Sequence, residues 1–135
     1  MGLILDSSIV ITSERRGHSV LQILEQMRIA YGEVDIGLSV VTIAELTHGA
    51  YRSKNNADQL RRLMFIERLC DDFPVYPFTL EIARLTGRIE GQQAAQGIAI
   101  AFEDLAIGAT ALHLGFGLAT LNVRRFLLIP GLSVI

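Results

Sequence analysis

Apolar and polar positions follow one another in blocks that predict short buried strands and longer amphipathic helices. The run Leu3-Ile4-Leu5 is apolar throughout, which is typical of a strand with both faces buried. From Asn55 to Asp72, apolar residues recur at helical spacing on one side and arginines lie on the others, which predicts an amphipathic helix. By the same criteria we expect helices over 18–31, 80–93 and 102–114, and strands over 36–41, 117–121 and 132–135.

The alternation of strands and helices indicates the architecture. Short apolar strands separated by helices imply a parallel sheet covered by helices on both faces, which is an α/β fold. A chain of 135 residues is long enough for one sizeable core and too short for two. No repeat, low-complexity tract or linker interrupts it, so we expect a single domain over residues 1–135.

Composition and charge narrow the classes of function. Half of the residues are hydrophobic and 19% are charged, as in globular proteins. No apolar run approaches the roughly 20 residues that span a bilayer, and the start lacks the basic region of a signal peptide. We therefore expect a cytoplasmic protein without a membrane segment. The net charge of −2 excludes a strongly cationic protein held to nucleic acid by charge alone. The single cysteine, Cys70, has apolar neighbours and is expected in the core.

Three carboxylates occupy positions where the pattern would favour an apolar or neutral residue. Asp6 follows the first predicted strand, Glu45 lies shortly after the second, and Asp104 opens the apolar helix 102–114. The ends of parallel strands and the helix starts that follow them meet along one edge of a sheet. Acids gathered there repel one another unless a cation joins them, and Mg²⁺ prefers oxygen ligands. The pattern therefore predicts a divalent metal site.

Each acid also has a purely local interpretation. Asp6 can form an Asx turn or cap the helix after its strand. Thr42 resembles a helix N-cap, and Glu45 three residues later would complete a capping box. Asp104 can be a first-turn acid that the helix dipole favours. The metal site is preferred because all three acids follow strands or loops at the starts of different helices.

Five segments resemble, in the same order along the chain, the motifs of PIN-domain nucleases. They are residues 3–9, 39–49, 102–112, 118–126 and 129–132. Together they extend over essentially the whole chain. Within this family the sequence is most similar to the VapC-type toxins of toxin–antitoxin operons.

The resemblance implies a three-layer α/β/α sandwich with a mainly parallel sheet. It also implies an endoribonuclease that depends on Mg²⁺, with Mn²⁺ able to substitute, in which a metal-activated water attacks the RNA phosphodiester. Such toxins are commonly homodimers and are kept silent by a cognate antitoxin. The expected partners are therefore RNA, a second copy of the chain, and an antitoxin that places a basic side chain over the acids.

Carried over by position, the resemblance identifies Asp6, Glu45 and Asp104 as the catalytic, metal-binding acids. Ser8 falls where the family often has a small polar residue near the metal. Asn122 falls at a fourth catalytic position that is Asp in some members and Asn in others. Asn supplies no negative charge, so the number of metal ions stays open.

Four basic residues are candidates for contact with RNA: Arg52, Lys54, Arg124 and Arg125. Arg52 and Lys54 are favoured because they follow the helix of Glu45. Arg125 stands where many family members have an acid, and it either contacts an RNA phosphate or faces solvent. Solvent is the preferred expectation for Arg125.

Other functions fit the residues less well. A receiver-like domain needs paired acids early in the chain and a late lysine, but Lys54 is the only lysine. Gly115-Phe116-Gly117 precedes a strand instead of following one, and no third glycine completes a dinucleotide-binding loop. The alternative that remains is a PIN-like module without catalysis that binds RNA or a protein partner. Asn122 and Arg125, which depart from the acidic pattern, keep this alternative open.

Overall fold

The computed structural model describes residues 1–135 and contains a sheet of four strands in the order β3-β2-β1-β4. The strands are β1 (Gly2–Leu5), β2 (Asp35–Ser39), β3 (Val75–Tyr76) and β4 (Gly117–Ala119). The helices are α1 (Ser7–Arg15), α2 (Val20–Tyr31), α3 (Val40–Tyr51), α4 (Asn56–Asp72), α5 (Leu80–Ala94), α6 (Phe102–Leu114) and α7 (Val123–Phe126). Every neighbouring pair of strands is parallel, which confirms the predicted sheet. None of the helices is both long and apolar enough to cross a membrane.

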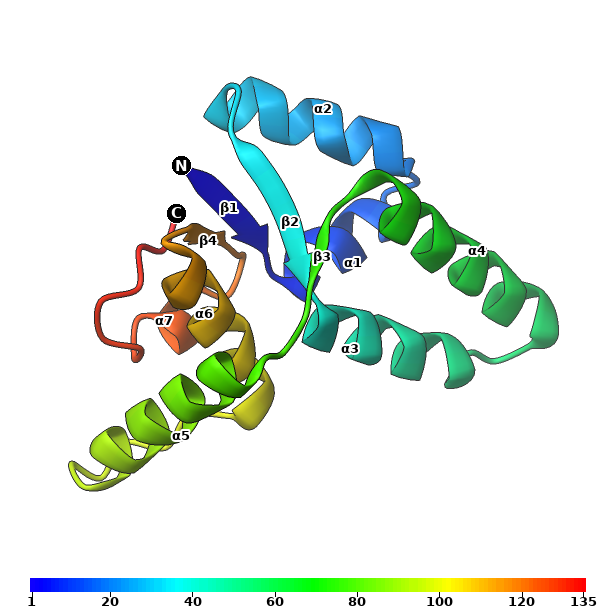
Figure 1. Cartoon of the computed structure of the whole chain (residues 1–135). Coiled ribbons are helices and arrows are strands. Elements are labelled where there is room, and N and C mark those ends of the chain that lie inside the picture. The colour runs from blue at the N-terminus through cyan, green and yellow to red at the C-terminus, as the bar shows by residue number, and fades with distance from the viewer.

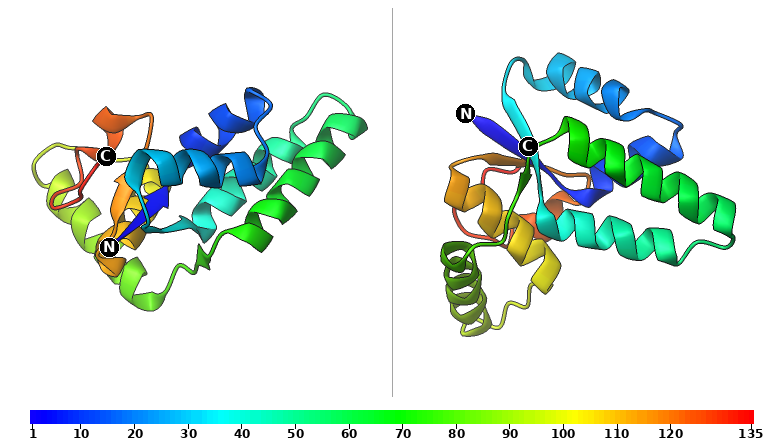
Figure 2. Two further views of the ribbon diagram at one scale, coloured as in Figure 1. Left: turned by 90° about the horizontal axis from the view of Figure 1, so that it is seen from above. Right: turned by 45° about the vertical axis from the view of Figure 1, so that its right-hand side comes forward.

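Two hydrophobic clusters cover the two faces of the sheet. Leu5 of β1 and Ala119 of β4 pack into a cluster with residues of α1, α2, α3 and α4. Their neighbours Ile4 and Leu118 pack into a second cluster with residues of α5, α6 and α7. Because successive side chains of a strand point to opposite faces, this division places the sheet between two helical layers (Figures 1 and 2). The three-layer α/β/α sandwich is therefore confirmed.

Local signals at the helix ends account for most boundaries. Asn55 caps α4, its Oδ1 accepting a hydrogen bond of 2.8 Å from the Asp58 backbone N–H. Ser19 and Gln22 form a capping box at the start of α2, and Gly32 ends that helix with a positive φ of 78°. Side-chain caps satisfy backbone N–H groups that have no partner within the helix. The predicted helices are confirmed at these positions to within two residues.

The junction of β2 and α3 differs from the prediction. The strand ends at Ser39, whose Oγ accepts a hydrogen bond of 3.1 Å from the Val41 backbone N–H, and α3 begins at Val40. Thr42 therefore lies inside the helix, where its hydroxyl is buried without a partner. The expected capping box of Thr42 with Glu45 is wrong, because Ser39 already provides the cap.

Two further expectations are wrong. Residues 132–135 form no strand, because only Val134 bridges to Leu118 of β4. Cys70 is exposed, since the buried side of α4 is formed by Ile66 and Leu69. Each step along a helix turns about 100°, so the residue after Leu69 lies outside the contact with the core.

Candidate functional site

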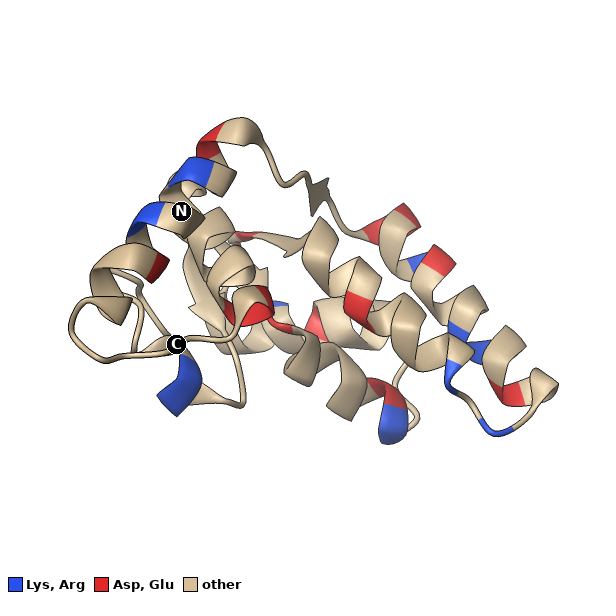
Figure 3. Ribbon diagram, turned by 90° about the horizontal axis from the view of Figure 1, so that it is seen from below, with Lys and Arg blue, Asp and Glu red and all other residues tan.

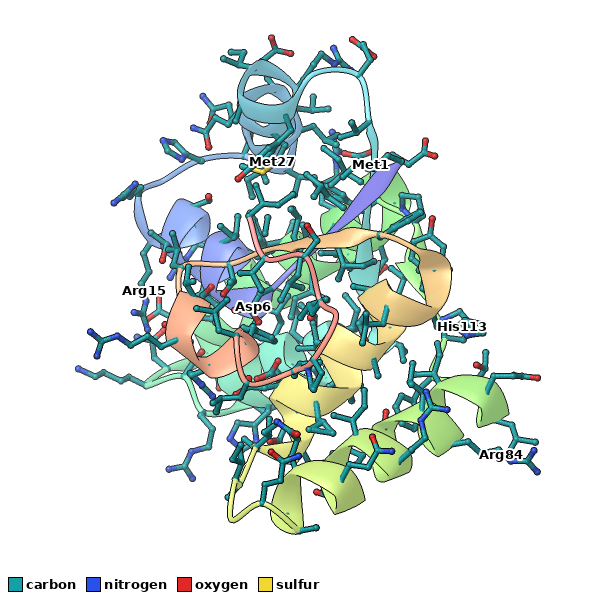
Figure 4. All side chains as sticks on the ribbon, turned by 90° about the vertical axis from the view of Figure 1, so that its left-hand side faces the viewer. Met1, Asp6, Arg15, Met27, Arg84 and His113 are labelled. Carbon is teal, nitrogen blue, oxygen red and sulfur yellow. The ribbon has the colours of Figure 1, made fainter.

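Asp6 is held at the carboxyl end of β1 by neutral donors. It caps α1, and its side-chain Oδ2 accepts hydrogen bonds from the hydroxyls of Ser8 (2.7 Å) and Thr120 (2.9 Å) and a longer one from the Ser8 backbone N–H (3.4 Å). The residue is 3% exposed, and Figure 4 shows it in the interior of the fold. The local prediction of a helix cap is thus confirmed, and the same contacts fix the direction of the carboxylate.

Thr120 belongs to this cluster although sequence reasoning did not single it out. Its hydroxyl donates to Asp6 and accepts a hydrogen bond of 2.9 Å from the Asn122 backbone N–H. The register of the sheet explains the contact: Leu5 of β1 pairs with Ala119 of β4, so the next residues, Asp6 and Thr120, are neighbours. A polar residue directly after each of two paired strands is the signal that identifies Thr120.

Glu45 lies in the second turn of α3 and carries an unsatisfied oxygen. Its Oε1 is buried and has no hydrogen-bond partner. Burial raises the pKa of the Glu45 carboxyl, and the charges of Asp6, Asp104 and Glu103 raise it further, whereas the nearby hydroxyl of Ser7 acts in the opposite direction. A buried carboxylate oxygen without a partner is costly, and a cation would satisfy it.

Asp104 lies in the first turn of α6 and is 6% exposed. Its Oδ2 accepts a hydrogen bond of 2.9 Å from Nε of Arg125, and Nη2 of the same arginine lies 2.8 Å from that oxygen in an ion pair. Burial raises the pKa of the Asp104 carboxyl, Arg125 opposes that rise, and the charges of Asp6 and Glu103 add to it. Arg125 is exposed, as expected, but it also pairs with Asp104, which the sequence did not predict.

The three acids come from three separate elements, yet each lies close enough to another to affect its charge. Asp6 raises the pKa of both Glu45 and Asp104, and Asp104 raises that of Glu45. Figure 3 shows acidic segments of several elements near one another in the middle of the molecule. The cluster therefore has an excess of negative charge that only Arg125 reduces by direct contact.

The cluster fits a divalent cation in composition but not in the present side-chain directions. Carboxylate oxygens are the ligands that Mg²⁺ and Mn²⁺ favour, and Glu45 Oε1 has no other partner. However, no three His, Cys, Asp or Glu side chains are arranged to hold one ion together. Asp104 is turned to Arg125, and Asp6 to Ser8 and Thr120. A shared ion therefore requires side chains of the cluster to change direction.

The other sequence candidates lie at different distances from this cluster. Asn122 is exposed at the start of α7, and its side chain makes no capping hydrogen bond. Arg52 and Lys54 are exposed in the connection from α3 to α4 (basic segments in Figure 3). Arg52 follows Glu45 by seven residues, which is about 10 Å along a helix axis. Arg124 is exposed and forms no ion pair, so of the four basic candidates only Arg125 touches an acid of the cluster.

A cavity of about 110 Å³ opens beside Glu45 between α1, α3 and α4. Its lining includes the charged residues Glu14, Arg15 and Arg62. Burial raises the pKa of Glu14, and the charges of Arg62, Arg61 and Arg15 oppose that rise. Basic side chains thus lie next to the acid cluster on the side of α1 and α4.

Comparison with known proteins agrees with the geometry. The family model described as "PIN domain" matches residues 3–131. The chain is 37% identical over 135 residues to Ribonuclease VapC1 of Rickettsia felis, covering all of this chain and 96% of that protein. The structure of VapBC-1 from nontypeable Haemophilus influenzae superposes with a TM-score of 0.82 at 27% identity, covering 100% of this chain and 97% of that one.

A more distant structure has the same fold. It is VapBC-5 of Mycobacterium tuberculosis, which is described as a member of the VapBC family of toxin–antitoxin systems. It superposes with a TM-score of 0.71 at 22% identity, covering 100% of this chain and 97% of that chain.

Proposed function

We propose that this chain, which belongs to the PIN-domain family and within it to the VapC ribonucleases, is a divalent-metal-dependent endoribonuclease and the toxin of a toxin–antitoxin pair. The observation that carries the metal dependence is Glu45 Oε1, a buried oxygen without a partner beside two further buried acids. Such a cluster is unfavourable by itself and becomes favourable when a cation enters.

In this proposal Asp6, Glu45 and Asp104 hold the ion, which is Mg²⁺ or, in its place, Mn²⁺. When bound, the ion supplies an acidified water and neutralises charge on the phosphate. Ser8 and Thr120 keep Asp6 Oδ2 in a fixed direction, as supporting hydrogen bonds do for metal ligands elsewhere. The Asn122 amide lies at the exposed rim, where it can hydrogen-bond to the substrate or a water but adds no charge for a second ion.

The RNA backbone needs cations outside the acid cluster. Arg52, Lys54 and Arg124 are exposed and form no ion pairs, so they are free to approach phosphates. Arg15 and Arg62 line the cavity beside Glu45 and extend the same basic side of the molecule. We assign these residues to substrate binding and not to the chemical step.

The proposed partners are an antitoxin protein and a second copy of the chain. The relatives named VapBC support an antitoxin, since one of them is described as a member of a family of toxin–antitoxin systems. A short reading frame for a DNA-binding protein is therefore expected next to this gene. Co-expression of its product should suppress RNA cleavage by this chain.

The test is cleavage of total RNA by antitoxin-free protein with Mg²⁺, with Mn²⁺ and with a chelator. Wild-type protein is expected to cut only with metal, and Asp6→Ala is expected to lose cleavage. Asp71→Ala is a matched control, because it removes an exposed acid of α4 that is not among the charges that shift the pKa of Glu45 or Asp104. Metal-independent cutting, or equal cutting by Asp6→Ala, would contradict the proposal.

A second candidate is a module that binds RNA or protein without cleaving it. The ion pair of Asp104 with Arg125 favours it, because a cation of the chain itself already neutralises one acid. Folded protein that binds single tRNAs but cuts none of them with any metal would select this candidate.

A further inference from the structure

Arg125 and Asp104 form an asymmetric ion pair. The carboxylate is buried at the start of α6, whereas the arginine side chain is 57% exposed on the four-residue helix α7. Two nitrogens of the guanidinium, Nε and Nη2, lie within 2.9 Å of the same oxygen, Asp104 Oδ2. The acid is thus fixed in the core, and the cation that neutralises it lies at the surface.

Two properties make this cation exchangeable. An ion pair with one partner in solvent contributes little to stability, because water competes for the exposed charge. Arginine as a residue type is charged at every physiological pH, so the contact with Asp104 ends by exchange with water or another cation and not by loss of a proton. A divalent ion that uses Asp104 together with Asp6 and Glu45 must compete with the hydrogen bond and the ion pair that Arg125 makes to Oδ2.

We propose that Arg125 is a tethered cation that occupies Asp104 in the metal-free protein and competes there with the divalent ion. It thereby raises the metal concentration at which the site fills. The inference rests on the proposed function, since it takes Asp104 as a ligand of that ion. Arg125 acts on the ligand and is a positioning residue.

Arg124 provides the matched control. It is the preceding residue on α7, carries the same charge and is also exposed, but it contacts no acid. Replacing either arginine by alanine changes the net charge equally. Only Arg125→Ala removes the hydrogen bond and the ion pair with Asp104. A difference between the two variants therefore reports the contact and not the general field of the protein.

The experiment is titration of full-length, antitoxin-free protein with Mn²⁺, in which electron paramagnetic resonance measures the free ion. We expect Arg125→Ala to bind Mn²⁺ about two- to five-fold more tightly than wild type, the factor that corresponds to a half-exposed ion pair. Arg125→Gln, which keeps most of the side-chain length, should shift in the same direction. Arg124→Ala should bind Mn²⁺ with an affinity close to that of wild type.

The same titration separates the two proposals. Equal affinity of Arg125→Ala and Arg124→Ala, or weaker binding by Arg125→Ala, would overturn the role of Arg125 while leaving the metal site intact. Equal binding by wild type and Asp104→Asn would overturn both, because the ion would then not use Asp104. Thermal unfolding of each metal-free variant verifies that it is folded.

Discussion

Asp6 and Asp104 are both almost completely buried, but the fold stabilises them in different ways. At the carboxyl edge of the sheet, Asp6 Oδ2 accepts hydrogen bonds from the hydroxyls of Ser8 and Thr120, and Asp6 Oδ1 accepts a longer one of 3.5 Å from Ser7. Asp104 instead pairs with a charged side chain that lies at the surface of α7. Neutral donors orient a carboxylate without cancelling its charge, whereas Arg125 neutralises the charge of Asp104 and, in our proposal, competes with another cation for it.

The two acids therefore differ in how firmly the fold holds them: the direction of Asp6 is fixed, whereas the cation beside Asp104 is exchangeable. The direction of Asp6 depends on the pairing of β1 with β4, which places Thr120 beside Asp6. The neutralisation of Asp104 depends on one side chain, Arg125, of the four-residue helix α7. We therefore expect changes at Asp104 to abolish function, and changes at Thr120 to weaken it by loosening an otherwise fixed ligand.

The largest effect is expected for Asp104→Asn. Asn keeps the size of the side chain but removes the charge, so the fold should persist while metal-dependent RNA cleavage falls by more than about 100-fold. Changing a residue that only supports a metal ligand already lowers metal affinity or activity roughly 10–100-fold, so the loss of a ligand should have a larger effect. Initial rates of cleavage at saturating Mn²⁺ measure the loss.

Glu103→Gln controls for charge in the same helical turn, because Glu103 is exposed and forms no ion pair. It should keep activity near that of wild type. Full activity of Asp104→Asn would mean that Asp104 is not part of the metal site, and its difference from Asp6 would then have no bearing on cleavage.

A smaller effect is expected for Thr120→Val, which preserves shape and removes one hydroxyl. Asp6 Oδ2 would lose a donor and the Asn122 backbone N–H its acceptor. An unsatisfied buried polar group costs about 1–3 kcal/mol, so the free energy of unfolding should fall by that order. Cleavage should fall by about 10-fold, as for other supporting residues of metal ligands.

Thr86→Val is the control, because its buried hydroxyl donates to the Ile82 carbonyl within α5, away from the acids. It should lower stability without lowering cleavage by the folded protein. If both variants cleaved RNA equally well, Thr120 would have no part in positioning Asp6.

The smallest effect concerns stability and pH. The pKa of Glu45 is raised above its ordinary value of 4.5 in the folded protein, so the folded state binds more protons than the unfolded state at and above that pH. Metal-free protein therefore loses stability as pH rises from about 4.5 through the raised pKa. Glu45→Gln has no such titration and should be more stable than wild type at pH 7 by on the order of 1 kcal/mol.

Urea unfolding in the presence of a chelator at pH 4.5 and pH 7 measures this difference. The advantage of Glu45→Gln should narrow at the lower pH. If metal-free wild type were more stable than Glu45→Gln at neutral pH, the buried charge of Glu45 would not destabilise the folded protein.

The sequence predicted those parts of the fold that local patterns determine. The apolar run 3–5 and the amphipathic segment 55–72 each identified their element, and the strand-end rule indicated where Asp6 would lie. The junction at Ser39 was missed because Val40 and Val41 are apolar and β-branched, so they continue the pattern of a strand. Only the hydroxyl of Ser39 marks the start of α3.

The contacts between distant segments were beyond local reasoning. Arg125 and Asp104 are separated by 21 positions and meet only because β4 returns the chain beside β1, bringing α7 next to α6. The contact of Thr120 with Asp6 spans 114 positions and depends on one strand register. Such contacts follow from the tertiary fold, and they are what makes the surroundings of Asp6 and Asp104 different.

The most direct test of the central claim is a crystal of this protein soaked with Mn²⁺ and measured for anomalous scattering. We expect one strong peak among the carboxylates of Asp6, Glu45 and Asp104, with Arg125 displaced from Asp104 Oδ2. A well-ordered crystal with no peak there at saturating Mn²⁺, and with the Arg125 contact unchanged, would contradict it.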